Sequence, residues 1–452
     1  MRRLLLPLLL ASTATAQTPP VKPQTPDVPV FPDFSIPSVP STIGTEPLTA
    51  DEAVRVAIAN QPELRTQRDQ WIAAEGRAEQ ARAGLLPRLT LSYSETSQSV
   101  FKGQALSNGT NGLGLRANGA IAVSQLLYDF GRTRAFARQQ GSLAVAAQWQ
   151  YRQAVSNTSL SVRRSFYGLA RAIELQKSAD ANLKNRNAQL ALADARLKSG
   201  LGAPSDFLNA KNAVANATNA LTLARGATVT ARIALALALG VDPRTPITLA
   251  DSDEAEPKGD LGDLIDAALT NRPEFNGARA DVDAQKHGLA LAHRTNAPTI
   301  SLTASFNSRG TNDPFLNQSS NIGLVFSWPV GDVGLTSGSI KQAKANLDAS
   351  RSNLKGLTQS ITGEVVQASI DEQSAAQRLE TAQAQLANAK ELVRVATGRY
   401  QGGIGLFTDV IAAQDALFQA EGNVSTARAD LQVARAALRR AIGGDSLPDS
   451  AF

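Results

Sequence analysis

The chain of 452 residues contains the same unit twice, and this duplication limits the folds open to it. Residues 59–64 (ANQPEL) match residues 270–275 (TNRPEF) at an offset of 211 positions. The stretch that begins at Arg196 matches the one that begins at Arg399 at an offset of 203. The offset changes once, between residues 93 and 124, so the copies differ in the length of one loop. A repeated unit of this kind predicts equivalent elements that bury their apolar faces against each other.

Each copy is predicted to contain a helix, a β-hairpin, a long helix and a return helix. Thr49 is the expected cap of the first helix, and Pro62 is expected at a kink or a first turn. The first copy, residues 48–240, is predicted to have a helix over 48–85, a hairpin over 88–127, a long helix over 131–198 and a return helix over 206–240. The second copy, residues 261–443, is predicted to have a helix, a hairpin over 298–330, a long helix over 338–401 and a return helix over 409–442.

The hairpins show the two-residue period of strands. Leu89, Leu91 and Tyr93 alternate with small polar residues, and alternation resumes after a loop of Gly, Asn and Ser over 103–112. In the second copy the apolar positions are Ile300, Leu302, Ala304 and Phe306. Each hairpin is therefore expected to have one apolar face and one small polar face. Strands of about 10–13 residues match the length that crosses a membrane as a β-strand.

The long helices are predicted to be rods. At 1.5 Å per residue, residues 131–198 would extend roughly 100 Å. The two shorter helices of a unit together have nearly the length of its rod, so each rod is expected to pack antiparallel against both. The linker, residues 241–260, would then lie near mid-height. Only 5% of the residues are aromatic, which suits helices packed closely through small side chains.

The hairpins require an assembly. Four strands cannot close a barrel, because about eight are the practical minimum, and open sheet edges are not tolerated in lipid. Two chains would supply eight strands and three would supply twelve. We favour a homotrimer, since the wider ring leaves more room for transport. The fold class expected is thus mainly α with membrane β-hairpins, a tandem repeat forming an α-helical barrel plus a transmembrane β-barrel. A soluble coiled-coil protein with ordinary hairpins is the alternative.

Composition argues against several other classes of protein. The chain has no Cys, and its two histidines, His287 and His293, lie six residues apart, which is unsuitable for two ligands on one helix face. No sequence motif of a hydrolase, P-loop or dinucleotide-binding enzyme is present. The 45 basic and 40 acidic residues are spread along the chain rather than gathered in a basic stripe. We therefore expect no enzyme activity, no cofactor, no metal and no nucleic-acid partner.

The N-terminus has the pattern of an export signal. Arg2 and Arg3 precede an apolar stretch over 4–11, and Ala14 and Ala16 form an A-x-A-like cleavage site. Residues 1–16 are thus predicted to be a signal peptide, with an uncleaved anchor as the alternative. A proline-rich extension follows over 17–47, and residues 444–452 form a C-terminal tail. No other stretch is an uninterrupted apolar 18-mer, so no membrane-spanning helix is expected.

Three sequence features resemble the TolC family of outer-membrane factors, in its unlipidated form. The first is the duplication with its Asn-x-Pro-Glu stretches at Asn60 and Asn271. The second is the joint from strand to helix at residues 125–131, echoed at 328–334. The third is the turn at residues 399–410, echoed from Arg196 onward. The resemblance covers about residues 48–443.

The resemblance implies an outer-membrane channel of a tripartite efflux pump or a type I secretion system. It implies a homotrimer whose 12-stranded barrel crosses the outer membrane, in contact with outer-membrane lipid, and whose α-barrel extends into the periplasm. Its tip would dock on a periplasmic adaptor protein, which links it to an inner-membrane transporter that supplies the energy. A structural envelope protein without a conducting pore is the alternative function. Drug, metal and protein export look alike in this chain.

The resemblance also assigns roles to residues at the two turns between long and return helices. Those that match the adaptor-contact turns are Gly200, Leu201, Gly202, Gly403, Ile404 and Gly405. The glycines are also expected to reverse the chain, since Gly reaches positive φ freely. An exposed apolar residue at a loop tip suits contact with a partner helix.

A pore constriction is expected beside these turns. The resemblance assigns it to Ser205, Asp206, Tyr400 and Asp409, with Asp206 and Asp409 giving six carboxylates in a trimer. Helix capping is the alternative, in which Ser205 or Thr408 caps a helix and the Asp favours its N-terminal dipole. Two positions depart from the family, because a gate carboxylate falls on Ala412 and a gate-locking arginine falls on Gly405.

Overall fold

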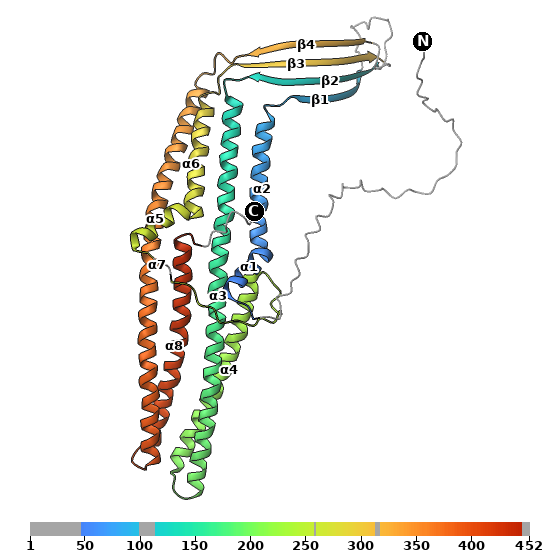
Figure 1. Ribbon diagram of the computed structural model, residues 1–452. Coiled ribbons are helices and arrows are strands. Elements are labelled where there is room, and N and C mark those ends of the chain that lie inside the picture. Colours follow the sequence, from blue (N-terminus) through green and yellow to red (C-terminus); the bar gives the residue numbers. More distant parts are fainter. Residues whose placement is uncertain (1–46, 99–113, 257–258, 312–316, 445–452) are drawn as a thin grey trace, which may run out of the picture. The chain divides into compact units, whose positions relative to one another are not determined.

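A computed structural model describes residues 47–98, 114–256, 259–311 and 317–444, which all lie in one compact unit, residues 43–452 (Figure 1). The predicted signal peptide, the proline-rich extension up to residue 46 and the tail from residue 445 lie outside the described residues. The described elements are α1 (Ala50–Asn60), α2 (Pro62–Ala83), β1 (Arg88–Gln98), β2 (Gly114–Tyr128), α3 (Arg132–Lys198), α4 (Pro204–Leu239), α5 (Leu261–Asn271), α6 (Pro273–Ala292), β3 (Thr299–Thr311), β4 (Asn317–Ser327), α7 (Leu335–Gln401) and α8 (Phe407–Ala441).

The two halves of the chain repeat the same order of elements. The helix expected over 48–85 is divided at Gln61, and Pro62 occupies the first turn of α2, as Pro273 does in α6. Thr49 caps α1, as predicted, and forms a capping box with Glu52. Proline is tolerated at these positions because the first N–H groups of a helix have no partner within it.

The four strands form one antiparallel sheet in the order β1-β2-β3-β4. Its register places Leu91 opposite Ile121, and Ile121 opposite Phe306. The apolar residues on this face include Leu89, Leu91, Tyr93, Ile121, Val123, Leu302, Ala304, Phe306, Ile322, Leu324 and Phe326. The opposite face has Thr90, Ser92, Ala120, Ala122, Ser301, Thr303 and Ser305. The fold class predicted from the sequence is confirmed, with one apolar face and one small polar face.

Each long helix, α3 and α7, has 67 residues, roughly 100 Å, and runs from the sheet to a turn at its far end (Figure 1). α3 packs against α2 and α4 of its own half and against α6 and α8 of the other half. Buried alanines recur every seven residues, which is the spacing of a coiled-coil seam and lets helices approach closely. Buried positions in register are Ala172, Ala179, Arg186 and Ala193 in α3, and Ala375, Ala382, Ala389 and Ala396 in α7.

The linker between the two halves lies against the middle of α3. Leu48 and Leu249 form a parallel β-bridge, with the Leu48 amide donating to Thr248 O at 2.9 Å. Ile247 and Leu48 are buried in a cluster with Phe166 of α3 and residues of α1 and α4. The N-terminal end of the described chain and the linker are thus fixed at the same level.

The structure corrects one sequence expectation about helices. The return helices begin earlier than expected, α4 at Pro204 and α8 at Phe407, because proline suits a first turn and Phe407 packs into a buried cluster. Within the described ranges, α4 is also long and apolar enough, by length and composition alone, to cross a membrane. Asn, Thr, Lys and Arg interrupt the Ala and Leu residues of α4, so it contains no uninterrupted apolar run of that length. Its contacts with α3 give it a packed role in this chain.

Candidate functional site at the helical turns

The turns after α3 and α7 have the same backbone geometry. Gly200 and Gly403 have φ values of +73° and +76°, the left-handed conformation that glycine adopts without strain. The Leu201 amide donates to Arg196 O at 2.9 Å, and the Ile404 amide donates to Arg399 O at 3.0 Å. These are the bonds of a Schellman ending, which satisfy the last carbonyl groups of a helix. The glycines at these two positions reverse the chain as predicted.

Gly202 and Gly405 do not reverse the chain through a positive φ, which differs from the prediction. Neither has a positive φ. A Cβ on Gly202 would lie 3.0 Å from the carbonyl carbon of Arg196, and a Cβ on Gly405 would lie 2.9 Å from Cβ of Arg399. These glycines are needed because the chain passes too close to the preceding helix to accommodate a side chain.

The apolar side chains of the turns are exposed. Leu201 is 83% exposed and Ile404 is 76% exposed, and Leu406 beside them is also exposed. The turns lie at the ends of α3 and α7 opposite to the sheet, as Figure 1 shows. Each turn therefore presents an exposed aliphatic residue at the equivalent position.

Three of the four expected constriction residues lie in the first turns of the return helices. Asp206 is half-buried, and Ser205 and Asp409 are exposed. The capping alternative is wrong in one respect, because α4 and α8 have no side-chain cap and Ser205 and Thr408 lie inside their helices. The carboxylates remain in the first turn, where the helix dipole favours a negative charge.

Tyr400 lies away from the exposed surface of the turns. Its ring is buried beside Phe407, with centroids 5.2 Å apart, and the Arg196 guanidinium lies 4.4 Å from its centre. Ala193 of α3 and Val410 of α8 belong to the same cluster. In the single chain, Tyr400 therefore joins the two helical hairpins, and only Ser205, Asp206 and Asp409 of the predicted set have accessible side chains.

Sequence analysis missed an ion pair between the halves. Arg186 is 1% exposed and donates to the carboxylate of Asp415, whose side chain is 65% exposed. Its Nε also donates to Asn182 Oδ1 at 3.3 Å. Burial lowers the pKa of Arg186, and the Asp415 charge opposes this shift. The sequence does contain one indication of this burial, because Arg186 falls in the seven-residue spacing of the buried alanines of α3.

A second missed cluster surrounds the linker at mid-height. Arg163, 4% exposed as a side chain, donates to the carboxylates of Glu254 in the linker and Asp51 in α1. Tyr167 donates to Glu254 at 3.1 Å, and burial raises its pKa. The hydrogen bond from Arg163 holds the pKa of Asp51 below its ordinary value.

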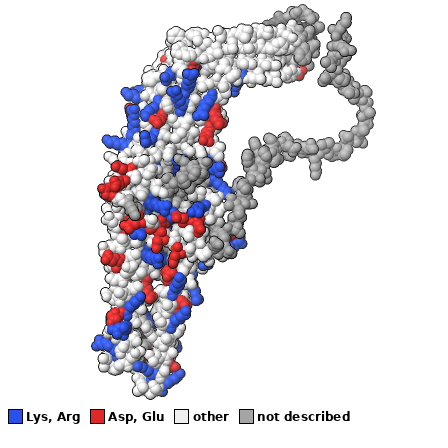
Figure 2. Space-filling view, in the orientation of Figure 1, with Lys and Arg blue, Asp and Glu red and all other residues white. Residues whose placement is uncertain are grey.

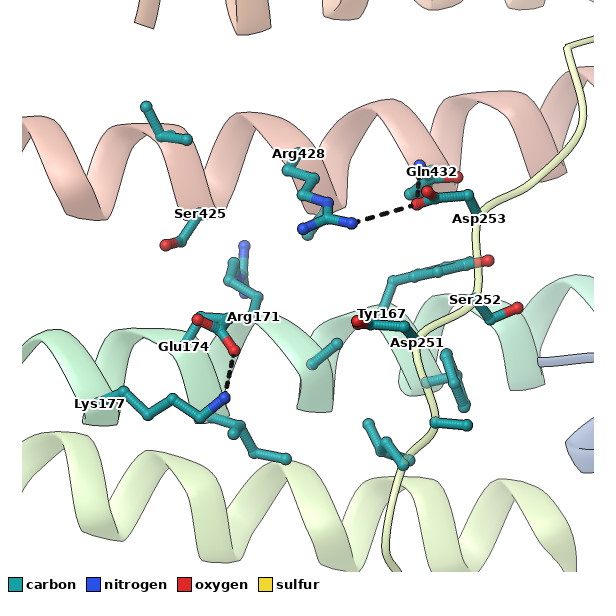
Figure 3. Close-up of a pocket in the computed structure, with 17 residues that line it drawn as sticks. Tyr167, Arg171, Glu174, Lys177, Asp251, Ser252, Asp253, Ser425, Arg428 and Gln432 are labelled. Carbon is teal, nitrogen blue, oxygen red and sulfur yellow. Dashed lines mark hydrogen bonds and ion pairs between the residues drawn. The ribbon is translucent and has the colours of Figure 1, made fainter. Parts of the chain in front are cut away.

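The groove beside this cluster is lined by α3, the linker and α8 (Figure 3). Asp253 of the linker pairs with Arg428 at 3.6 Å and accepts a hydrogen bond from Gln432 at 2.8 Å. On the α3 side, Lys177 pairs with Glu174 at 2.6 Å. These charges are satisfied within the chain, so the cluster fastens the linker to both halves. Within the described part of the chain, no group of three or more His, Asp or Glu side chains is placed to hold a metal ion.

Comparison with known proteins places these features in one family. The model of the outer membrane efflux protein family matches residues 53–241 and 264–444. CyaE of Bordetella pertussis is 30% identical over 262 residues, which cover 56% of this chain and 53% of CyaE. The outer membrane protein TolC of Escherichia coli is 23% identical over 407 residues, which cover 84% of this chain and 79% of TolC.

Solved structures agree with this assignment at the level of the fold. The outer membrane protein VceC of Vibrio cholerae superposes with a TM-score of 0.74 at 21% identity, over 87% of this chain and 96% of VceC. The chain belongs to the outer membrane efflux protein family. The predicted resemblance is confirmed, and so is the predicted function as an outer-membrane channel for efflux or secretion.

Proposed function

We propose that three copies of this chain form a passive export conduit from the periplasm through the outer membrane. The observation that carries the proposal is the four-stranded sheet with one continuous apolar face. Its outer strands, β1 and β4, have free edges within the described chain, and lipid does not satisfy free backbone groups. Three copies supply twelve strands, enough for a closed barrel with an aqueous interior. The polar face of the sheet, which has small side chains, then lines the channel.

The two turns are proposed to dock on a periplasmic adaptor protein that links the channel to an inner-membrane transporter. Gly200, Gly202, Gly403 and Gly405 hold the turns in shape. Their apolar residues, Leu201 and Ile404, stand free at the end of the rods. A partner helix that covers them would bury apolar surface on both proteins.

The narrowest part of the conduit is proposed to lie just above these turns. Asp206 and Asp409 would supply six carboxylates in a trimer, and a ring of carboxylates favours cations. Ser205 would lie beside them, and Tyr400 would support the ring through its contact with Phe407. The substrate is left open, because a passive conduit receives its specificity from its partners.

The adaptor contact is tested by placing a charge on each apolar tip. Leu201→Glu/Ile404→Glu is expected to lower export at least about tenfold, since burying a charge in an apolar contact is costly. The matched control, Ser199→Glu/Gln401→Glu, places the same charges at exposed polar positions of the same turns. Export by cells and trimer content of the outer membrane are measured for both.

Trimer content is expected to be unchanged in both variants, because neither touches the sheet or the helix seams. Normal export by the Leu201→Glu/Ile404→Glu variant would refute the docking role. Single-channel recording in a lipid bilayer tests the conduit itself. A purified trimer that inserts but conducts no ions would favour a structural envelope protein instead.

A further inference from the structure

Below the sheet, the described helices present basic residues to a groove that the transport function leaves unexplained. Residues that line it come from α2, α3 and α6, and its volume is about 380 Å³. They are Arg82, Ala137, Arg138, Gly141, Ser142, Val145 and His287. Figure 2 shows Lys and Arg side chains gathered on the helices just below the mostly uncharged sheet.

The arginines of this groove have no acidic partner within the part of the chain that the structure describes. Among the described residues, neither Arg82 nor Arg138 makes an ion pair, and both are exposed. The Arg82 guanidinium lies over Gly141 of α3, because a Cβ there would be 3.9 Å from Arg82 Nη2, an ordinary contact distance. Arg134, one turn from Arg138 on α3, is exposed and also unpaired within the described chain. The groove therefore combines concentrated positive charge with an apolar wall at Val145 and Ala137.

The groove lies close to the level at which the lipid-facing surface ends. Arg82 is in the last turn of α2, and Arg138 is six residues into α3, about 9 Å below its start. Exposed apolar side chains mark the joint above it, namely Leu127, Tyr128, Phe130, Trp328, Val330 and Val333. Tyr and Trp favour the boundary between hydrocarbon and water. Headgroups occupy about 5–7 Å on each side of the hydrocarbon, within reach of an arginine side chain.

The groove also lies on the outer side of the conduit. Arg138 and Arg163 are 25 residues apart, close to seven turns of 3.6 residues, so they share one face of α3. The linker crosses that face, where Glu254 pairs with Arg163. A linker that crossed the channel side would obstruct the conduit, so this face is the external one. This step depends on the proposed function.

We propose that Arg82 and Arg138, with His287 and Ser142, bind the phosphate of an anionic glycerophospholipid in the inner leaflet of the outer membrane. Guanidinium groups form paired, charge-assisted hydrogen bonds to phosphate oxygens. Val145 and Ala137 contact the glycerol and the upper acyl chain. The lipid joins α2, α3 and α6 directly below the barrel.

Retention of lipid by the purified full-length protein tests the site. Native mass spectrometry compares retained phosphatidylglycerol with phosphatidylcholine, which has no net charge. Arg82→Gln/Arg138→Gln is expected to weaken phosphatidylglycerol retention about tenfold or more, since each arginine near the headgroups contributes separately to anionic-lipid binding. The control Arg225→Gln/Arg378→Gln removes two exposed arginines of α4 and α7 and is expected to change nothing.

Two further variants separate lipid binding from folding. Arg82→Lys/Arg138→Lys keeps the charge and should retain most of the binding, whereas Gly141→Leu fills the groove and should lose it. Unchanged retention by the Arg82→Gln/Arg138→Gln protein, or equal retention of phosphatidylcholine by the wild type, would overturn the proposal. Displacement of the lipid by inorganic phosphate alone would identify free phosphate as the ligand and would also overturn it.

Conductance of the same preparations separates this proposal from the proposed function. A trimer that conducts ions but shows no lipid preference would contradict the lipid site and leave the proposed conduit standing. A protein that does not conduct but still retains phosphatidylglycerol through Arg82 and Arg138 would contradict the conduit and leave the lipid site standing.

Discussion

Arg186 occupies a position that alanine holds in the other half of the molecule. At the offset of 203 residues it corresponds to Ala389, and its partner Asp415 corresponds to Asn212. Both members of the ion pair are therefore specific to one copy, and the pair joins α3 of the first half to α8 of the second. A buried arginine is tolerated in a close-packed seam only when its charge and donors are satisfied.

Loss of Asp415 alone is predicted to destabilise the protein more than replacement of both partners. Asp415→Asn leaves Arg186 buried without its counter-charge and is expected to destabilise the protein by about 1–3 kcal/mol. Arg186→Ala/Asp415→Asn, which restores the alanine of the other copy, is expected to lie closer to the wild type. Denaturant midpoints of the detergent-solubilised trimer, taken at one protein concentration, measure both. A double variant less stable than Asp415→Asn alone would contradict this account.

The two joints from strand to long helix have the same local structure. In each joint an aspartate, Asp129 or Asp332, accepts hydrogen bonds from local backbone amides, and a glycine with positive φ precedes the helix. The residue before each glycine also has a positive φ, Phe130 at +56° and Val333 at +43°. For a branched side chain this conformation is strained, and Val333 is fully exposed.

Relief of this strain is predicted to stabilise the joint. Val333→Asn is expected to stabilise the protein in detergent by about 1 kcal/mol, because Asn tolerates the left-handed region better than a branched residue. Val330→Asn is the control, since Val330 is also an exposed valine of this joint but lacks a positive φ. Thermal unfolding in detergent is the measurement, and equal effects of the two changes would show that backbone strain is not the cause.

The ion pair between Asp51 of α1 and Arg163 of α3 is predicted to respond to acid. Because Arg163 lowers the pKa of Asp51, the pair stabilises the fold above the ordinary aspartate pKa of 3.8, and this stability is lost as pH falls through the lowered value. Asp51 is mostly exposed, so its contribution is expected to stay under about 1 kcal/mol. Asp51→Asn should reduce the loss of stability between about pH 5 and pH 3. If the Asp51→Asn variant lost as much stability between these pH values as the wild type, the ion pair would not be the cause of that loss.

At the scale of the whole molecule, the duplication and the alternating strands were enough to predict the fold. The pattern of Leu89, Leu91 and Tyr93 fixes which face is apolar, because strand side chains alternate strictly. The contacts between the halves could not be predicted in the same way. Nothing local marks Arg186 as a partner of Asp415, or Arg163 as a partner of Glu254, since each pair is separated by a long stretch of chain. The burial of Tyr400 likewise depends on how two helical hairpins meet.

The proposed constriction would be a property of the whole assembly, because one chain supplies only two of its six proposed carboxylates. Asp409 is exposed and lies in the first turn of α8, where its charge costs little in the free chain. Around a threefold axis the same charges would repel one another and attract cations. Asp409→Asn is therefore expected to lower cation selectivity and to weaken block by divalent cations about threefold or more, with little change in trimer stability.

Single-channel recording in a planar bilayer measures both effects. Asp242→Asn is the control, because Asp242 is an acid of the linker that pairs with Arg244 at 2.6 Å, far along the chain from either turn. Removal of the Asp409 carboxylate should change cation selectivity and divalent block, whereas removal of the Asp242 carboxylate should change neither. If Asp409→Asn and Asp242→Asn give the same selectivity and the same divalent block as the wild type, the ring of carboxylates does not limit the conduit, and the narrowest part lies elsewhere.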